Sequence, residues 1–449
     1  MEQDKSKSPC RKEPHMAQEK KEEKLGDLSR RTFLKGSAAA SAAALASQAG
    51  GRNAYAGGTD RIRVGFIGCG GRGTIDARNC VRSAPGVEIY AMGDLFQDRL
   101  NSSRNRLEKD LGKDGMNVTD DRCFVGFDAY KKVLDCDVDM VILTTPPHFR
   151  PQQFRAAVEA GKHVFMEKPV AVDPVGVRSV IKSAEIAEDK GLGVLAGTQM
   201  RHKFDYVNVM KRVHDGAIGD IMAAQSYYLT GTLWVRKKKP EWSEMEWMVR
   251  NWLYFQWLSG DHIVEQDVHK IDILNWAFGG PPKKAMAMGG REVRKGPEHG
   301  NIYDHFSVEY VYPNGARALN MCRQMKGATH RLGEYIEGTK GRVVPTGGYA
   351  VKIEGENAYE YKGKMTDPSV QEHKDHIESI RKGDPLNDGR RVAESTLTAI
   401  MGRMSAYTGK ELSWDWILNQ SKLRLGPDKY EFGDVAIRPV PTPGQEKLV

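Results

Sequence analysis

The chain has 449 residues, of which 40% are hydrophobic and 28% charged, an ordinary composition for a soluble globular protein of two or three domains. This composition argues against collagen, a disulfide-dense scaffold, a disordered chain and a coiled coil. The formal net charge is +8, and half of it lies in the first 56 residues, which hold 11 basic and 7 acidic side chains. The remaining charge is too small to indicate a nucleic-acid partner, and no apolar run is long enough for a membrane span.

The N-terminal segment has the order of an export signal. The pair Arg30 and Arg31 precedes a weakly apolar, alanine-rich stretch at residues 36–50, and residues 54–56 (Ala-Tyr-Ala) offer a small-x-small cleavage site. This order resembles a twin-arginine signal. It implies that residues 1–56 are removed, that the twin-arginine translocase is a transient partner, and that the mature protein is periplasmic or otherwise exported. The alternative is a cytosolic chain with an amphipathic arm.

Five cysteines follow this segment. They are Cys69, Cys80, Cys123, Cys136 and Cys322. Their odd number argues against a disulfide framework, and no Cys/His spacing is typical of a zinc site. We therefore expect neither disulfides nor a bound metal.

From residue 57 to 198, strand-like and helix-like runs alternate, which is typical of a parallel sheet covered by helices. Strands are predicted at residues 64–67, 87–92, 140–144, 164–166 and 193–198. After about residue 199 the pattern changes to period-two runs, which are typical of half-buried antiparallel strands.

Two of these period-two runs, at residues 305–311 and 316–321, flank Asn314 and Gly315. Asn-Gly tolerates the positive φ angles of hairpin turns, so a hairpin is predicted here. A helix is predicted at about residues 392–407, where Gly409 follows it.

The predicted fold class is therefore α/β, with two domains after the signal. Residues 57–198 are expected to form a Rossmann dinucleotide-binding domain. Residues 199–449 are expected to form a substrate-binding α+β domain with an open, mostly antiparallel sheet. Its helix at 392–407 has the option of packing back on the first domain.

A glycine-rich turn joins the first predicted strand to its helix with the spacing GxGxxG. The first two glycines of this motif allow a tight turn and a close backbone approach, and the helix N-terminus offers free N–H groups to a pyrophosphate. The predicted cofactor contacts in this turn are Gly68, Gly70, Gly71, Arg72 and Gly73.

Asp94 follows Gly73 by 21 residues, at the end of the second predicted strand. A carboxylate at this place accepts hydrogen bonds from ribose hydroxyls. Its negative charge favours NAD over NADP, whose 2′-phosphate it would repel, although Arg99 nearby argues the other way. The alternative is that Asp94 caps a helix beginning at Leu95.

Further motifs follow the glycine turn. They are Thr145-Pro146, Ala160-Gly161-Lys162-His163-Val164, Glu167-Lys168-Pro169 and the segment GDHIVEQDVHKID at residues 260–272. Together they resemble the Gfo/Idh/MocA oxidoreductases (glucose-fructose oxidoreductase, inositol dehydrogenase and their relatives) over residues 60–415. The resemblance implies that Thr145, Pro146, Glu167 and Lys168 lie at a nicotinamide cofactor.

Lys168, Glu265 and His269 are the predicted catalytic residues. Lys168 follows a parallel strand at the sheet edge where ligands bind, so its ammonium can stabilise a substrate alkoxide. Glu265 and His269 stand four residues apart on one helix face, and an imidazole is a suitable proton acceptor near neutral pH. The family's usual aspartate is Glu265 here, and Asp267 replaces a small residue. The alternative for His269 is a buried, hydrogen-bonded core histidine.

Substrate contacts are expected from the catalytic helix and from residues that leave the sheet at its ligand edge. They are Lys168, Gln199, Arg201, Glu265, His269 and Asp272. Asp272 would orient the imidazole or bind a sugar hydroxyl. His148 and Arg150 are candidates of similar standing.

Five of the eight tryptophans lie just before the catalytic helix. They are Trp234, Trp242, Trp247, Trp252 and Trp257. Aromatic faces stack on sugars, so a polyol or saccharide pocket is one interpretation. Core packing or a subunit contact is the other. The basic run at residues 236–239 is expected to be a solvated loop.

The sequence thus predicts an exported NAD-dependent oxidoreductase with a tightly bound cofactor and a carbohydrate or polyol substrate, working as a homo-oligomer. One alternative is a redox-cycle glycosidase, which oxidises a sugar, eliminates its substituent and reduces it again. Another is a non-catalytic sugar or dinucleotide sensor, because fold alone does not decide function.

Overall fold

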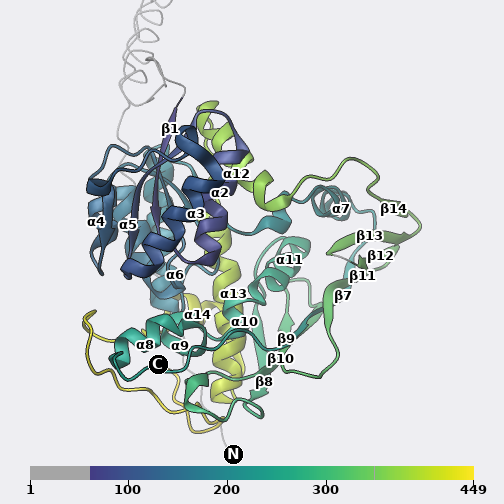
Figure 1. Ribbon diagram of the computed structural model, residues 1–449. Coiled ribbons are helices and arrows are strands. Elements are labelled where there is room, and N and C mark those ends of the chain that lie inside the picture. Colours follow the sequence, from purple (N-terminus) through teal and green to yellow (C-terminus); the bar gives the residue numbers. More distant parts are fainter. Residues whose placement is uncertain (1–60, 348) are drawn as a thin grey trace, which may run out of the picture. The chain divides into compact units, whose positions relative to one another are not determined.

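Figure 1 shows the computed structural model of the chain, which describes residues 61–347 and 349–449. The predicted export signal at residues 1–56 lies outside the described residues. Among the helices that are described, none combines the length and the apolarity of a membrane span.

The first sheet has six parallel strands in the order β3-β2-β1-β4-β5-β6. Their bounds are β1 Ile62–Ile67, β2 Val87–Asp94, β3 Cys123–Val125, β4 Met140–Leu143, β5 His163–Met166 and β6 Val194–Ala196. The five predicted strands are confirmed, and β3 is an additional short strand at the edge. The strand order reverses between β1 and β4, so a crevice opens beyond the carboxyl ends of these two strands.

Helices cover both faces of this sheet, as the burial of β4 shows. Met140 and Ile142 belong to the apolar core shared with α2 and α3, whereas Val141 and Leu143 belong to the core shared with α5 and α6. The helices are α2 Gly71–Ser83, α3 Gln97–Gly115, α4 Ala129–Leu134, α5 Arg150–Glu159, α6 Pro174–Asp189 and α12 Pro368–Arg381. A strand buried on both faces has no polar alternation, which explains the continuous apolar runs in the sequence.

The second sheet has nine strands in the order β14-β13-β12-β11-β7-β10-β9-β8-β15. Their bounds are β7 Ile221–Thr230, β8 Lys284–Gly290, β9 His305–Val311, β10 Arg317–Gln324, β11 Arg331–Gly338, β12 Gly341–Gly347, β13 Ala350–Gly355, β14 Tyr359–Glu360 and β15 Leu412–Ser413. All neighbours pair antiparallel except β10 and β7. The predicted hairpin is confirmed between β9 and β10, where Gly315 takes a φ of +88°.

The remaining helices lie beside the second sheet or between the two sheets. They are α7 Phe204–His214, α8 Glu244–Arg250, α9 Gln256–Ser259, α10 His262–Glu265, α11 Val268–Phe278, α13 Gly389–Thr408 and α14 Trp414–Asn419. Short 3-10 turns are η1 Asp120–Arg122, η2 Pro147–Phe149, η3 Gln199–His202, η4 Trp252–Tyr254 and η5 Pro297–His299.

Helix α13 links the helices that cover the first sheet to the second sheet. It contacts α6 on one side and β8 and α11 on the other, and it is buried along most of its length (Figure 1). Its Arg403 is completely buried, and Nη1 donates to the carbonyl oxygens of Val172 at 2.9 Å and Gly260 at 2.8 Å. The helix ends at Gly409, which has a φ of +70°.

Candidate active site

The glycine loop from Gly68 to Gly73 is tightly packed on one side and open on the other. A Cβ atom at Gly68 would stand 2.6 Å from the backbone of Thr144, and one at Gly73 would stand 2.2 Å from Thr144 Oγ1. Only glycine avoids these contacts. A Cβ atom at Gly70 or Gly71 would meet no atom within 4 Å. This open space above the N-terminus of α2 fits a pyrophosphate bound by free N–H groups.

Asp94 ends β2, and two backbone N–H groups hold its carboxylate. Cys69 N donates to Oδ2 at 2.6 Å, and Phe96 N donates to Oδ1 at 2.8 Å. Burial raises the pKa of Asp94 to about 6, and the two hydrogen bonds lower it in part. The prediction of a cap for a helix from Leu95 is wrong, because α3 begins at Gln97. Each oxygen keeps a second lone pair for a ribose hydroxyl.

These residues line one cavity of about 370 Å³. Of the predicted cofactor residues, it includes Gly68, Gly70, Gly71, Arg72, Gly73, Asp94, Thr145 and Pro146. Glu167 and Lys168 lie outside its lining. Several lining residues were not predicted as cofactor contacts, among them Phe96, Arg99, Phe127, Trp234, Arg236, Arg250 and Trp252. The last four come from the segment between β7 and α9, about 140 residues or more after Asp94 in the sequence.

Lys168 and Glu265 meet although 97 residues separate them in the chain. Lys168 follows β5, and its Nζ donates to the backbone oxygen of Glu265 at 2.7 Å and to Oε1 at 3.3 Å. The two side chains are 13% and 12% exposed. An ammonium has three N–H groups, so one is left for a substrate oxygen.

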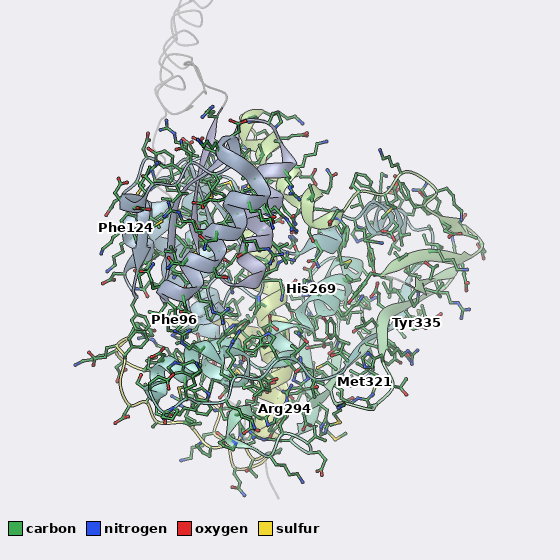
Figure 2. The ribbon with its side chains drawn as sticks, viewed as in Figure 1. Phe96, Phe124, His269, Arg294, Met321 and Tyr335 are labelled. Atoms are coloured by element: carbon green, nitrogen blue, oxygen red, sulfur yellow. The ribbon has the colours of Figure 1, made fainter. Side chains whose placement is uncertain are left out.

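His269 lies in the first turn of α11 (Figure 2), whereas Glu265 ends α10. The prediction that both stand on one helix face is therefore wrong, because the helix is interrupted at residues 266–267. Its ring makes no hydrogen bond to the described residues, unlike the hydrogen-bonded core histidine of the alternative interpretation. Burial holds the pKa of His269 well below its ordinary value, with the positive charges of Lys168 and Arg72 acting in the same direction. The imidazole is therefore neutral near pH 7 and able to accept a proton.

Asp272 is buried and fully engaged. Its carboxylate accepts hydrogen bonds from Arg201 Nε at 2.8 Å, from Arg391 Nη1 at 3.1 Å and from Ser395 Oγ at 2.7 Å. The two guanidinium groups outweigh burial and hold the pKa of Asp272 below its usual range. Asp272 and Arg201, both predicted substrate contacts, thus bind each other. Gln199 begins η3, and its Oε1 is buried with no hydrogen-bond partner among the residues that the structure describes.

Arg72, at the start of α2, lies close to three carboxylates. Its Nε lies 2.7 Å from Glu167 and 3.0 Å from Asp76, and its Nη2 lies 3.6 Å from Glu372. The other oxygen of Glu167 accepts the backbone N–H of Lys168 at 3.1 Å. Arg72 and Glu167 therefore connect the glycine loop to Lys168.

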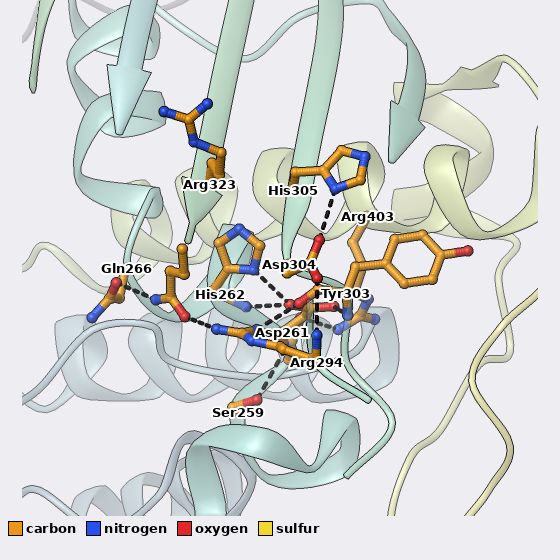
Figure 3. A network of polar contacts seen from close by, with 12 residues as sticks. Ser259, Asp261, His262, Gln266, Arg294, Tyr303, Asp304, His305, Arg323 and Arg403 are labelled. Atoms are coloured by element: carbon orange, nitrogen blue, oxygen red, sulfur yellow. Dashed lines mark hydrogen bonds and ion pairs between the residues drawn. The ribbon is translucent and has the colours of Figure 1, made fainter. Parts of the chain in front are cut away.

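A network of polar contacts surrounds α10, the short helix that ends at Glu265 (Figure 3). Asp261, at a φ of +73°, accepts from the backbone N–H of His262 at 2.5 Å and from that of Tyr303 at 2.8 Å. Gln324 Nε2 donates to Gln266 Oε1 at 2.5 Å, which fixes the residue after Glu265.

His148 and Arg150 make hydrogen bonds to neighbouring loops. Arg150 is buried, and it donates to the carbonyl oxygens of Pro169 and Thr145, both at 2.6 Å. His148 Nε2 lies 2.7 Å from the hydroxyl of Tyr430, near the end of the chain. Neither contact was predicted from the sequence.

Asp267 is a buried carboxyl at the N-cap position of α11. It is completely buried, and burial raises its pKa to about 7. Asn320 of β10 and Cys322 stand beside it and lower that pKa in part. Within the described residues no group of three or more His, Cys, Asp or Glu could hold a metal ion. The five cysteines after the signal carry free thiols.

Comparison with known families identifies three parts of the sequence. Residues 62–196 match the profile described as an oxidoreductase family with an NAD-binding Rossmann fold. Residues 206–344 match the GFO/IDH/MocA C-terminal domain. Residues 27–47 match a twin-arginine translocation signal, which indicates export.

Two curated relatives illustrate the similarity. A myo-inositol 2-dehydrogenase of Thermotoga maritima is 22% identical over 337 residues, which are 72% of this chain and 90% of the relative. A glycosyl hydrolase family 109 protein of Shewanella baltica is 25% identical over 234 residues, which are 48% of this chain and 49% of the relative.

Among solved structures, a levoglucosan dehydrogenase in complex with NADH and levoglucosan has a TM-score of 0.61 and 17% identity. The match covers 79% of this chain and 99% of that protein, and it shows a common fold. Both sheets, the glycine loop and the two consecutive family profiles agree. This chain belongs to the Gfo/Idh/MocA family of oxidoreductases.

Proposed function

We propose that the chain is an exported NAD-dependent oxidoreductase that acts on a secondary hydroxyl, or the matching keto group, of a sugar, glycoside or cyclitol. One observation carries this proposal. The Lys168 ammonium, at the end of β5, is bonded to Glu265, and His269 with its unbonded ring follows four residues later. The names of the inositol and levoglucosan dehydrogenases support the substrate class.

The cofactor would lie in the 370 Å³ cavity, with its pyrophosphate over Gly70 and Gly71 and a ribose at Asp94. The charge of Asp94 supports NAD rather than NADP. When bound, the nicotinamide ring supplies a hydride acceptor or donor. Tight retention of the cofactor is part of the proposal, since free dinucleotide is expected to be scarce outside the cytoplasm.

The chain's own residues would handle the proton and the charge on oxygen. Neutral His269 accepts the proton of the substrate hydroxyl. Lys168 donates a hydrogen bond to the same oxygen and stabilises its negative charge as it develops. Glu265 holds the ammonium in place through two contacts. In the reverse direction the protonated His269 returns its proton to the alkoxide.

The wider organisation is proposed as well. We propose a signal at residues 1–56, a cofactor domain at 57–198 and a substrate domain at 199–449, with passage through the twin-arginine translocase to the periplasm. A homo-oligomer is supported by apolar side chains exposed on the second sheet, above all Met288 at 74%.

A redox-cycle glycosidase is the second candidate, and the similarity to a glycosyl hydrolase family 109 protein favours it. Both candidates would use the same cofactor cavity. They differ in the fate of the glycosidic bond, because only the glycosidase eliminates the substituent next to the oxidised carbon.

A panel of free sugars, cyclitols and aryl glycosides in deuterated water separates the two candidates. A dehydrogenase should accumulate reduced nicotinamide, followed by its near-ultraviolet absorbance, and give a keto product with its glycosidic bond intact. His269→Ala should suppress both signals. Release of the aryl group with deuterium beside the oxidised carbon, and no net reduced cofactor, would replace our first choice by the glycosidase.

A further inference from the structure

The tryptophan-rich segment between β7 and α9 has no part in the hydroxyl chemistry described above. Two of its tryptophans, Trp234 and Trp252, line the cofactor cavity together with Arg236 and Arg250. The glycine loop and Asp94 line the same cavity. The other two tryptophans of the segment, Trp242 and Trp247, pack in or against an apolar cluster that includes Phe96.

Hydrogen bonds fix the position of this segment. Trp247 Nε1 donates to the carbonyl oxygen of Arg236 at 2.8 Å, and Arg236 N donates to Asn251 Oδ1 at 2.8 Å. Asn251 is completely buried, and its Nδ2 donates to the carbonyl oxygen of Glu298 at 2.7 Å. These hydrogen bonds hold the backbone of Arg236 against α8 and against the loop before β9.

Arg250 binds the same segment to the N-terminal end of α3. Its Nη1 and Nη2 each lie 3.1 Å from an oxygen of Asp98, in the first turn of α3. The guanidinium carbon also lies 3.8 Å from the centre of the Phe96 ring. Phe96 comes two residues after Asp94, so the segment reaches the end of the cavity where the adenosine ribose is expected.

Two cations at this end interact with acidic residues only at longer range, Arg99 with Asp94 and Asp98, and Arg236 with Asp98. Within the described residues, neither Arg99 nor Arg236 forms an ion pair or a side-chain hydrogen bond. All three arginines, Arg99, Arg236 and Arg250, line the same cavity. Burial lowers the pKa of Arg236, and the positive charges of Arg99 and Arg250 act in the same direction. Neighbouring guanidinium groups repel, and a phosphate between them would remove the repulsion by accepting bidentate hydrogen bonds.

We infer that the segment from Trp234 to Trp252 forms the second wall of the dinucleotide site, in which Arg236 and Arg99 bind a phosphate group of the adenosine half. The inference rests on the proposed function, because it places a dinucleotide in this cavity. Trp234, 44% exposed, offers its indole face to the nucleotide beside that phosphate. The tryptophans at the cavity thus serve the cofactor rather than a sugar.

Calorimetric titration of the full chain, stripped of any bound nucleotide, with ADP-ribose, ADP and 2′,5′-ADP tests this. Arg236→Gln should weaken binding of at least one of these ligands about tenfold or more, the effect of losing one charged hydrogen bond. Arg99→Gln should weaken the same ligand. A loss confined to 2′,5′-ADP identifies a 2′-phosphate as the bound group, and a loss for ADP and ADP-ribose identifies the pyrophosphate.

Lys237→Gln is the matched control, since it removes a positive charge from the neighbouring residue, which does not line the cavity. It should bind all three ligands as the unchanged chain does, and all variants should keep the unfolding temperature. Unchanged binding of every ligand by Arg236→Gln would overturn the inference alone. Failure of the unchanged chain to bind any adenine nucleotide would overturn the proposed cofactor site together with it.

Discussion

At the scale of single residues, Lys168 separates cofactor binding from chemistry. Its ammonium is held by Glu265 and does not line the cofactor cavity. We expect Lys168→Met to bind NADH normally and to lose turnover by about 100-fold, the effect of removing one electrostatic donor. Steady-state rates with a competent substrate and fluorescence titration of NADH measure the two effects.

An exposed lysine on α6 provides the control for that substitution. Lys182→Met removes the same charge far from the site, so both its rate and its affinity should match those of the unchanged chain. Near-normal turnover of Lys168→Met would remove this residue from the proposed mechanism.

The lowered pKa of His269 predicts a pH profile of kcat/KM that differs from the profile expected for a free imidazole. Since burial, Lys168 and Arg72 lower its pKa in the folded chain, the base stays neutral as the pH falls through about 6.5. We expect kcat/KM for oxidation to stay level there and to fall only at lower pH, where the imidazole gains its proton. A rate that already halves near pH 6.5 would contradict the assigned base.

The same shift has a consequence for stability. The unfolded chain binds a proton at His269 before the folded chain does, so the free energy of unfolding should decrease as the pH falls below about 6.5. His269→Asn should remove this part of the decrease. Urea unfolding of the two proteins at a series of pH values measures the difference.

Asp272 shows what sequence patterns cannot tell about a residue. Its place three residues after His269 was visible, and it predicted a role at the substrate. Its partner Arg391 lies 119 residues further on, and only the folding of α13 against α11 brings them together. The sequence around Asp272 would be the same whether this aspartate contacted a substrate or formed a buried ion pair. The pattern alone could therefore not distinguish the two roles.

At the scale of elements, the glycine loop offers a paired test. A Cβ atom at Gly73 would stand 2.3 Å from the carbonyl oxygen of Gly68, so Gly73→Ala should destabilise the fold. A Cβ atom at Gly70 has free space, and that residue has a φ of −74°, which alanine adopts readily. We expect Gly70→Ala to unfold at the temperature of the unchanged chain but to bind NADH more weakly, because its methyl group enters the phosphate site. Thermal unfolding and NADH titration of both variants decide this, and equal behaviour of the two would contradict the assigned roles.

The elements predicted best were those with a continuous apolar run or a clear turn. The inner strands of the first sheet are buried on both faces, and Gly315 marks the hairpin between β9 and β10. Strand β3 escaped prediction because it has three residues and lies at an edge. Strand β12 includes Pro345 between glycines, a composition that reads as a loop.

At the scale of the whole molecule, the candidate site depends on contacts between distant parts of the chain. Lys168 meets Glu265 across 97 residues, and Arg403 bonds carbonyl groups 231 and 143 residues away. The family resemblance placed Lys168 and Glu265 in one active site, but it predicted no hydrogen bond between them. Arg236 and Trp234 belong to none of the family motifs. The sequence placed Arg236 in a solvated loop, and it left Trp234 open between a sugar pocket and core or subunit packing.

Export also concerns the whole molecule. The signal precedes a chain whose two sheets are linked by the buried helix α13, so the sheets would be exported as one folded unit. Transport by the twin-arginine route depends on the two guanidinium groups of Arg30 and Arg31, which serve as an address. We expect replacement of both by lysine to leave folded, NADH-binding precursor in the cytoplasm, measured by cell fractionation and immunoblotting. Replacing Lys20 and Lys21 by glutamine changes more charge outside the address, and this variant should still be exported. If the double lysine variant reached the periplasm in normal amounts, the twin-arginine route would be rejected, although the proposed activity would stand.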